Sequence, residues 1–284
     1  MENAHPMITR SKAGVFKPKT YTTTVSYAHE PVSLKVALSS SSWLPAMQDE
    51  YRALLQNRTW SLTSLPSGAK VVGCKWIFKK KFNADGTFQR HKARLVAKGF
   101  TQSPGLDYNE TFSPVVKPIT IRVVLSHVVS NNWPVHQIDV NNAFLNGDLT
   151  EDVYMNQPPG FESSDPTLVC KLHKAIYGLK QAPRSWFTKL SCTLEDLGFH
   201  STKSDTSLFI QFTNTSTIFV LIYVDDIIIT GSSMHAIKSI ISHLGSRFVL
   251  KDLGPLHYFL GIEVSKVADG SLHLSQTKYI NDLL

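Results

Sequence analysis

Cysteine is scarce in this 284-residue sequence, and its three copies, Cys74, Cys170 and Cys192, form no CxxC pair. An odd number without such spacing argues against a disulfide framework or a structural zinc site, and it fits a reducing compartment. Long apolar runs are also missing, because no stretch approaches the ~20 residues that span a bilayer. The opening MENAHPMITRSKAGVFKPK has no apolar core, so we expect no secretory signal and an intracellular location without a membrane.

Acidic residues are outnumbered, with 22 Asp and Glu against 29 Lys and Arg, which gives a formal net charge of +7. A basic surface favours polyanions such as nucleic acid, although many basic proteins bind neither nucleic acid nor membranes. The hydrophobic content of 42% is ordinary for a globular chain. The length allows one large domain or two modest ones.

Residues 1–42 are rich in Ser and Thr and contain three prolines. This composition predicts a disordered linker, because it cannot bury enough apolar surface to offset the entropy of ordering. A compact fold is expected from Trp43, since the apolar residues of segment 43–57 have helical spacing.

Segment 70–99 predicts a basic β-ribbon, two strand-like runs joined by the hairpin signal Asp85-Gly86. Asp85 is its only acidic residue. Runs of charge are usually solvated faces, but this one-sidedness equally favours a surface that binds phosphates. The basic residues are Lys70, Lys75, Lys79, Lys80, Lys81, Arg90, Lys92, Arg94 and Lys98.

The stretch IFVLIYVDDIIIT, residues 218–230, predicts two strands that are buried on both faces, with Asp225 and Asp226 at the turn between them. Adjacent carboxylates near a core repel each other and lose hydration, so a hard cation such as Mg²⁺ is a fitting partner. A polar turn without function is the alternative reading.

Asp139 ends the strand-like VHQIDV, where an aspartate is often only a helix N-cap. From residue 135 onward the order is strand, helix, strand, strand, helix and strands. This order predicts an α+β fold with a split βαβ antiparallel sheet backed by helices. Asp139, Asp225 and Asp226 would then lie on neighbouring strands and could hold two divalent ions for displacement at phosphorus.

Several long motifs occur in one order: KWIFKKKFNADGTFQRHKARLVAKGFTQSPGLDYNETFSPVV, QIDVNNAFLNGDLTEDVYMNQPPGF, KAIYGLKQAPRSWF and YVDD. Over roughly residues 43–284 the chain resembles the reverse transcriptase of Ty1/copia-type retrotransposons, especially those of plants. The resemblance implies a right-hand polymerase. Residues 1–42 would be an integrase-to-reverse-transcriptase linker, 43–134 the fingers, 135–250 the palm, and 251–284 the primer-grip region with the start of an incomplete thumb.

The same resemblance assigns site residues. Asp139, Asp225 and Asp226 would be the catalytic carboxylates, and with the Val140 carbonyl they would hold two Mg²⁺ ions, which Mn²⁺ could replace. Lys92 and Arg94 would bind the triphosphate, and Lys251 is a weaker candidate for a general acid.

Four further assignments come with alternatives. Phe144 matches the gate that excludes a 2′-hydroxyl, and it could also be a core aromatic. Gln181 would lie over the incoming nucleotide, or it could cap a helix. Tyr223 would sit beneath the primer end, and residues 259–263, with Phe259, Leu260 and Gly261, resemble the primer grip.

The expected partners are an RNA template, a DNA primer, deoxynucleoside triphosphates, and the integrase and ribonuclease H of the same Pol polyprotein. The family places such proteins in cytoplasmic virus-like particles, with the nucleus as a second location. Three hypotheses follow: an RNA-directed DNA polymerase, a truncated and inactive remnant that only binds nucleic acid, and a scaffold whose Asp-Asp pair is merely a turn.

Overall fold

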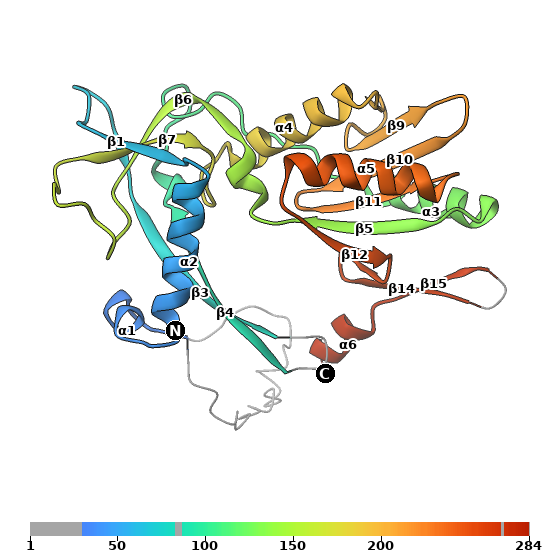
Figure 1. Cartoon of the computed structure of the whole chain (residues 1–284), viewed down its shortest axis with the longest axis horizontal. Helices are drawn as coiled ribbons and strands as arrows, with labels where there is room; N and C mark the ends of the chain where they lie inside the picture. Colours follow the sequence, from blue (N-terminus) through green and yellow to red (C-terminus); the bar gives the residue numbers. More distant parts are fainter. Residues whose placement is uncertain (1–29, 83–86, 268–269, 284) are drawn as a thin grey trace, which may run out of the picture.

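The computed structural model describes residues 30–82, 87–267 and 270–283. Helices and several separate sheets share the chain, so the predicted α+β class is confirmed (Figure 1). The hairpin turn predicted around Asp85 and Gly86 lies outside the described residues. Within the described part, no helix is long and apolar enough to cross a membrane.

A six-stranded sheet forms the larger half of the molecule, and each neighbouring pair of strands in it is antiparallel. Its strand order is β12-β5-β11-β10-β9-β8. The strands are β5 (Val135–Val140), β8 (His200–Ser201), β9 (Leu208–Phe212), β10 (Thr217–Tyr223), β11 (Asp226–Gly231) and β12 (Leu250–Pro255).

Both faces of this sheet are covered, as the uninterrupted apolar run of residues 218–224 predicts. Helices α4 (Ala182–Asp196) and α5 (Met234–Arg247) contribute to a core with Ile222 and Ile227 on one face. On the opposite face Leu221 and Ile228 pack with α3 (Pro118–Asn131) and a small antiparallel sheet. That small sheet comprises β13 (Tyr258–Phe259), β14 (Ile262–Lys266) and β15 (Leu272–Ser275), and α6 (Thr277–Leu283) follows it.

The predicted basic ribbon is present as a two-stranded antiparallel sheet of β3 (Cys74–Phe82) and β4 (Phe88–Ala97). Helix α2 (Trp43–Gln56), also predicted, packs against β4, and Trp43 contacts the His91 ring at a centroid distance of 4.4 Å (Figure 1). In the second half of β4 alternate residues, Ala93, Leu95 and Ala97, are buried in the core that includes α2. The residues between them face the opposite way.

A four-stranded sheet lies beside the ribbon, in the order β1-β7-β6-β2. Its strands come from distant parts of the chain, and β2 is parallel to β6. Two short 3₁₀ helices, η1 (Gly99–Thr101) and η2 (Ala143–Asn146), connect neighbouring elements. The strands are β1 (Trp60–Thr63), β2 (Val71–Val72), β6 (Asp148–Met155) and β7 (Val169–Lys174).

The linker predicted over residues 1–42 needs a correction in its described part. Residues 34–38 form helix α1 (Leu34–Leu38), and the Ser33 hydroxyl caps it by accepting a hydrogen bond from the Val36 N–H. Ala37 is fully buried, and Leu34 and Leu38 pack against the same core. The many serines around this short helix dominate the composition of the segment, so composition alone does not reveal its apolar residues. Residues 1–29 lie outside the described part.

Candidate active site

The carboxylates are brought together by strand register. Asp139 on β5 is the direct cross-strand partner of Asp226 on β11. Asp225 precedes Asp226, and its carbonyl accepts a hydrogen bond of 2.9 Å from the Val140 N–H. The predicted placement of Asp139 and the Asp-Asp pair on neighbouring strands is therefore confirmed.

The turn itself is shifted by one residue from the prediction. Tyr223 pairs with Asp226, so the two turn residues are Val224 and Asp225, and Asp226 is the first residue of β11. Val224 takes the left-handed conformation (φ 57°), which is strained for a β-branched side chain. The Trp186 Nε1–H on α4 donates a 2.7 Å hydrogen bond to the Val224 carbonyl and holds this turn in place.

Burial and mutual repulsion shift the titration of two carboxyls. Burial raises the pKa of Asp139, and the nearby Asp225 raises it further, while Lys251, Lys92 and Arg94 act in the opposite direction. Burial also raises the pKa of Asp226, against a hydrogen bond of 3.3 Å that the Gln137 amide donates to its Oδ1. Asp225 and Asp139 add to the increase at Asp226. The site therefore accumulates negative charge at an energetic cost.

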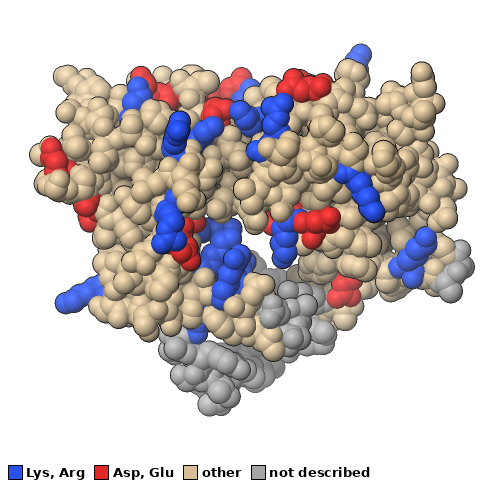
Figure 2. All heavy atoms as spheres, in the orientation of Figure 1, with Lys and Arg blue, Asp and Glu red and all other residues tan. Residues whose placement is uncertain are grey.

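Asp139 and Asp225 face the ribbon across a cavity of about 260 Å³, and Asp226 is not among the residues that line it. Figure 2 shows Lys and Arg side chains beside a hollow at the centre of this face, between the ribbon and the six-stranded sheet. Carboxylates from one sheet and cations from another thus line the same cavity. This arrangement suits a phosphate-containing ligand that binds together with metal ions. The lining residues are Lys81, Gln89, Arg90, Lys92, Arg94, Asp139, Val140, Asn141, Asn142, Tyr177, Asp225 and Lys251.

The two predicted triphosphate ligands both reach this cavity. The Arg94 guanidinium carbon lies 4.5 Å from the centroid of the Tyr177 ring, a cation–π contact that orients the fork. The Arg94 Nε is buried and has no hydrogen-bond partner among the described residues. Burial, together with Arg94, Arg90 and Lys81, lowers the pKa of Lys92. An anion at this position would relieve the repulsion among the cations.

The side chains of the site are of the type that binds divalent ions, but their arrangement is not that of a formed metal site. Within the described ranges no group of three or more His, Cys, Asp or Glu side chains is arranged to hold an ion. The donors available are nonetheless carboxylate oxygens, the ligands that Mg²⁺ prefers. The raised pKa values of Asp139 and Asp226 come partly from carboxylate repulsion, which a bound cation would remove.

Phe144 lies one layer behind the cavity. It belongs to η2, and its ring packs edge-on against Tyr177 with the centroids 4.8 Å apart. It is partly buried against both of the larger cores. Both readings of this residue are compatible with its position, because it supports Tyr177 as a core aromatic and lies close to the site.

Gln181 is not brought to the carboxylates. Its Oε1 accepts a 3.0 Å hydrogen bond from the Gln102 amide, and its Nε2 donates a 3.0 Å bond to the Asp107 carbonyl. It precedes α4 but its side chain makes no capping hydrogen bond. The residue instead borders a second cavity of about 590 Å³ between α4 and β6.

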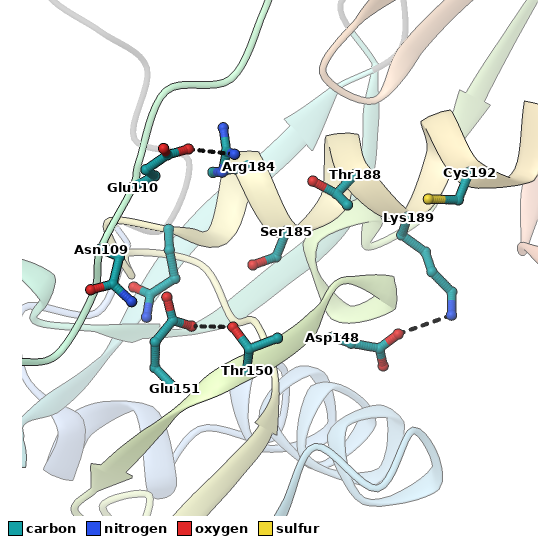
Figure 3. Close-up of a pocket in the computed structure, with 11 residues that line it drawn as sticks. Asn109, Glu110, Asp148, Thr150, Glu151, Arg184, Ser185, Thr188, Lys189 and Cys192 are labelled. Atoms are coloured by element: carbon teal, nitrogen blue, oxygen red, sulfur yellow. Dashed lines mark hydrogen bonds and ion pairs between the residues drawn. The ribbon is translucent and has the colours of Figure 1, made fainter. Parts of the chain in front are cut away.

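The second cavity is larger, yet four of its five charged lining residues form ion pairs, Glu151 being the exception among the described residues. Asp148 forms ion pairs with Lys174 and with Lys189, the latter at 2.9 Å. Glu110 pairs with Arg184 at the other end of the cavity (Figure 3). This pairing leaves the cavity beside Asp139 as the better candidate for a phosphate ligand.

The predicted primer-contacting residues form a group next to the turn. Tyr223 contacts Phe259 at a centroid distance of 6.4 Å. Leu260 and Gly261 form the tight turn between β13 and β14, both with positive φ (52° and 82°), as in a type I′ hairpin. Their spatial neighbourhood is established, and their roles toward a primer stay predictions.

Four lining residues had no assigned role in the sequence: Tyr177, Asn141, Asn142 and Gln89. The glycine that follows Tyr177 is the feature of the sequence that could have pointed to it. Gly178 has φ +92°, and an added Cβ there would lie 2.1 Å from the Ala97 carbonyl oxygen. This close approach places the Tyr177 carbonyl 2.8 Å from the Ala97 N–H, at the end of β4. Asn142 is also in the left-handed region (φ 51°), two residues after the end of β5.

Comparison with known proteins agrees with this geometry. Residues 57–284 match the family described as reverse transcriptase (RNA-dependent DNA polymerase), so the chain belongs to this family. Within it, the chain is of the Ty1/copia retrotransposon type.

The chain is 53% identical over 287 residues to the retrovirus-related Pol polyprotein from transposon RE1 of Arabidopsis thaliana, covering 99% of the chain and 20% of that polyprotein. It is 42% identical over 273 residues to the corresponding polyprotein from transposon TNT 1-94 of Nicotiana tabacum, covering 94% and 21%. The chain therefore spans about a fifth of the length of these curated relatives.

Proposed function

We propose that this chain catalyses RNA-directed DNA synthesis, adding deoxynucleotides to the 3′ end of a primer. The observation that carries the proposal is the cavity in which Asp139 and Asp225 face Lys92 and Arg94 from a different sheet. Carboxylates and cations in one cavity match the two charge requirements of nucleotidyl transfer, metal binding and triphosphate binding.

Asp139, Asp225, Asp226 and the Val140 carbonyl would hold two Mg²⁺ ions, with Mn²⁺ as a substitute. When bound, such a pair activates the attacking primer hydroxyl and stabilises the leaving oxygen. These residues would compensate the charge of the ions in a half-buried site, where electrostatic interactions are stronger than in water.

The ribbon residues would position the nucleotide. Arg94, oriented by Tyr177, can bind a phosphate through two donors, and Lys92 adds a point charge beside it. Lys251, the cross-strand partner of Asp139, would be a weaker candidate for the acid that donates a proton to the departing pyrophosphate. Phe144 would limit the space at the sugar through its contact with Tyr177.

In this proposal residues 43–134 act as fingers, 135–250 as the palm, and 251–284 as the primer grip and the beginning of a thumb. Tyr223 and the β13–β14 turn would contact the primer. The partners are an RNA template, a DNA primer and deoxynucleoside triphosphates. Integrase and ribonuclease H segments of one polyprotein would work beside it, in a cytoplasmic particle.

Primer extension on an RNA template tests the proposal. The chain should incorporate deoxynucleotides in Mg²⁺ or Mn²⁺, and Asp225→Asn with Asp226→Asn should lower incorporation by at least about 10³-fold. Incorporation that survives both substitutions would contradict the assignment of the site.

A second candidate is nucleic-acid binding without catalysis, favoured by the one-sided charge of the ribbon. It expects template binding that weakens steeply with salt and is insensitive to the aspartate substitutions. Extension by the 284-residue chain itself would exclude this candidate.

A further inference from the structure

Strand β4 carries the proposed triphosphate ligands, and one of its edges is paired with no strand among the described residues. The ribbon contains only β3 and β4, so β3 occupies a single edge of β4. Alternate N–H groups of a strand point to the same edge. On the free edge, the Ala97 N–H donates to the Tyr177 carbonyl at 2.8 Å.

Two residues earlier on that edge, the Leu95 N–H donates to the carboxylate of Glu50 on α2. Glu50 is only 8% exposed, which is unusual for a glutamate that lacks a metal or a catalytic assignment. Burial raises its pKa, and the hydrogen bond from Leu95 together with Lys92 and Arg94 opposes that increase. The carboxylate thus interacts with the strand and with both proposed phosphate ligands.

Glu50 also borders the space directly behind Lys92. A cavity of about 350 Å³ lies between α2 and β4, and Glu50 and Lys92 both line it. Lys92 lines the cavity of the carboxylates as well, together with Asn141 and Asn142, which border both spaces. Lys92 therefore lies between Glu50 and the cavity that Asp139 and Asp225 line.

We propose that Glu50 is a positioning residue for the nucleotide: its carboxylate docks α2 onto the free edge of β4 and thereby fixes the direction in which Lys92 and Arg94 present their cations. The inference rests on the proposed function for the identity of the anion. The hydrogen bond with Leu95 does not depend on it.

The test compares Glu50→Ala, which removes the acceptor, with Glu50→Gln, which keeps an oxygen for the Leu95 N–H. Asp49→Ala is the matched control, because it removes a carboxylate from the same turn of α2, where Asp49 is 72% exposed and pairs with Arg52. If the contact orients the two cations, its loss should weaken nucleotide binding about tenfold, the scale of one charge-assisted hydrogen bond to phosphate.

For Glu50→Ala we expect the KM for deoxynucleotide to rise about tenfold while kcat changes less than about twofold, the signature of weakened binding. Glu50→Gln should restore KM to within about threefold of wild type, and Asp49→Ala should leave it unchanged. In a Lys92→Ala, Arg94→Ala background, Glu50→Ala should have no further effect on KM. An unchanged KM in Glu50→Ala, or a full additive effect in that background, overturns the proposal.

Two measurements are independent of polymerisation. Hydrogen exchange of the peptide containing Leu95 should accelerate in Glu50→Ala and not in Glu50→Gln. Calorimetry should show that inorganic tripolyphosphate binds more weakly to Glu50→Ala than to wild type, and that Glu50→Gln does not share this loss. If these differences appear without primer extension, the proposed function fails and the role of Glu50 stands. If extension occurs and Leu95 exchange is equal in all variants, the role of Glu50 fails alone.

Discussion

Asp139 and Asp226 face each other across β5 and β11, and both carry the cost of a neighbouring carboxylate. Strand-like segments ending in aspartate predict this pairing, because their apolar runs mark two strands of one buried sheet. Glu50 and Tyr177 could not be assigned in the same way. They come from a helix and a loop far from the aspartates in sequence, and only packing around β4 places them near the site.

Asp226→Asn should stabilise the metal-free protein at pH 7. A raised folded-state pKa means that stability is present below the unfolded value, near 3.8, and is lost as pH rises through the folded value. The neutral amide avoids that loss, so we expect a Tm about 2 °C or more above wild type at pH 7 and no gain near pH 3.

Thermal melts from pH 3 to 8, with and without Mg²⁺, measure this difference. Asp196→Asn on the exposed side of α4 is the control and should change little. Mg²⁺ should raise the Tm of wild type more than that of Asp226→Asn. A variant less stable than wild type at pH 7 would show that repulsion does not dominate at Asp226.

The three cysteines should differ sharply in reactivity. Burial raises the pKa of Cys74 to about 11 and that of Cys170 to about 12, while Cys192 is exposed on α4. Because the thiolate is the reactive form, one thiol per native chain should react with an aromatic disulfide reagent at pH 8. Three should react in denaturant, and Cys192→Ser should abolish the fast phase. Two fast thiols in the native chain would contradict the buried environment of this pair.

The junction between the ribbon and the rest of the molecule depends on two glycines. A Cβ on Gly99 would lie 2.0 Å from the Gly178 carbonyl oxygen, and one on Gly178 would lie 2.1 Å from that of Ala97. Backbones this close leave no room for any side chain. The elements themselves, the hairpin and α2, follow from sequence periodicity. Their junction does not, since it pairs segments about 80 residues apart, a separation that local patterns do not encode.

Gly178→Ala should therefore destabilise the protein by about 3 kcal/mol, from backbone strain at positive φ plus a clash with backbone. Gly105→Ala is a matched control, because Gly105 also has positive φ (+76°) but nothing within 4 Å of an added Cβ. That variant should lose only about 1 kcal/mol. Denaturant unfolding measures both, and equal losses would mean that the close approach at Gly178 contributes nothing.

Over the whole molecule the net charge of +7 is unevenly distributed, with cations gathered along the ribbon opposite the aspartates. Composition predicts the basic character and the motif order predicts the α+β class. The four-stranded sheet, which joins residues 60–63, 71–72, 148–155 and 169–174, has no comparable signal, because its pairings are long-range and one is parallel. Helix α1 could not be predicted from composition either, but here the reason is local: its five residues are too few to change the composition of the segment.

Template affinity should depend on salt through the ribbon. Replacing Lys75, Lys81 and Arg90 by Gln should weaken binding, and the slope of log K against log salt should fall by roughly 0.7 for each single-strand phosphate that is no longer neutralised. Lys35, Lys203 and Lys238 lie outside the ribbon, and the same substitutions there form the control. Fluorescence anisotropy with a labelled RNA at a series of salt concentrations gives both slopes. Equal slopes for the two triple variants would remove the ribbon from template binding.

Because buried and cavity-facing residues alternate along β4, the position of each residue in this alternation matters as much as the residue type. Ala93 and Leu95 belong to the core under α2, while Lys92 and Arg94 border the cavity. Inserting or deleting a single residue within this strand would exchange the two faces, turning cations toward the core and small apolar groups toward the nucleotide. Substitutions on either face can be graded in effect, but a one-residue change in strand length removes binding and packing together.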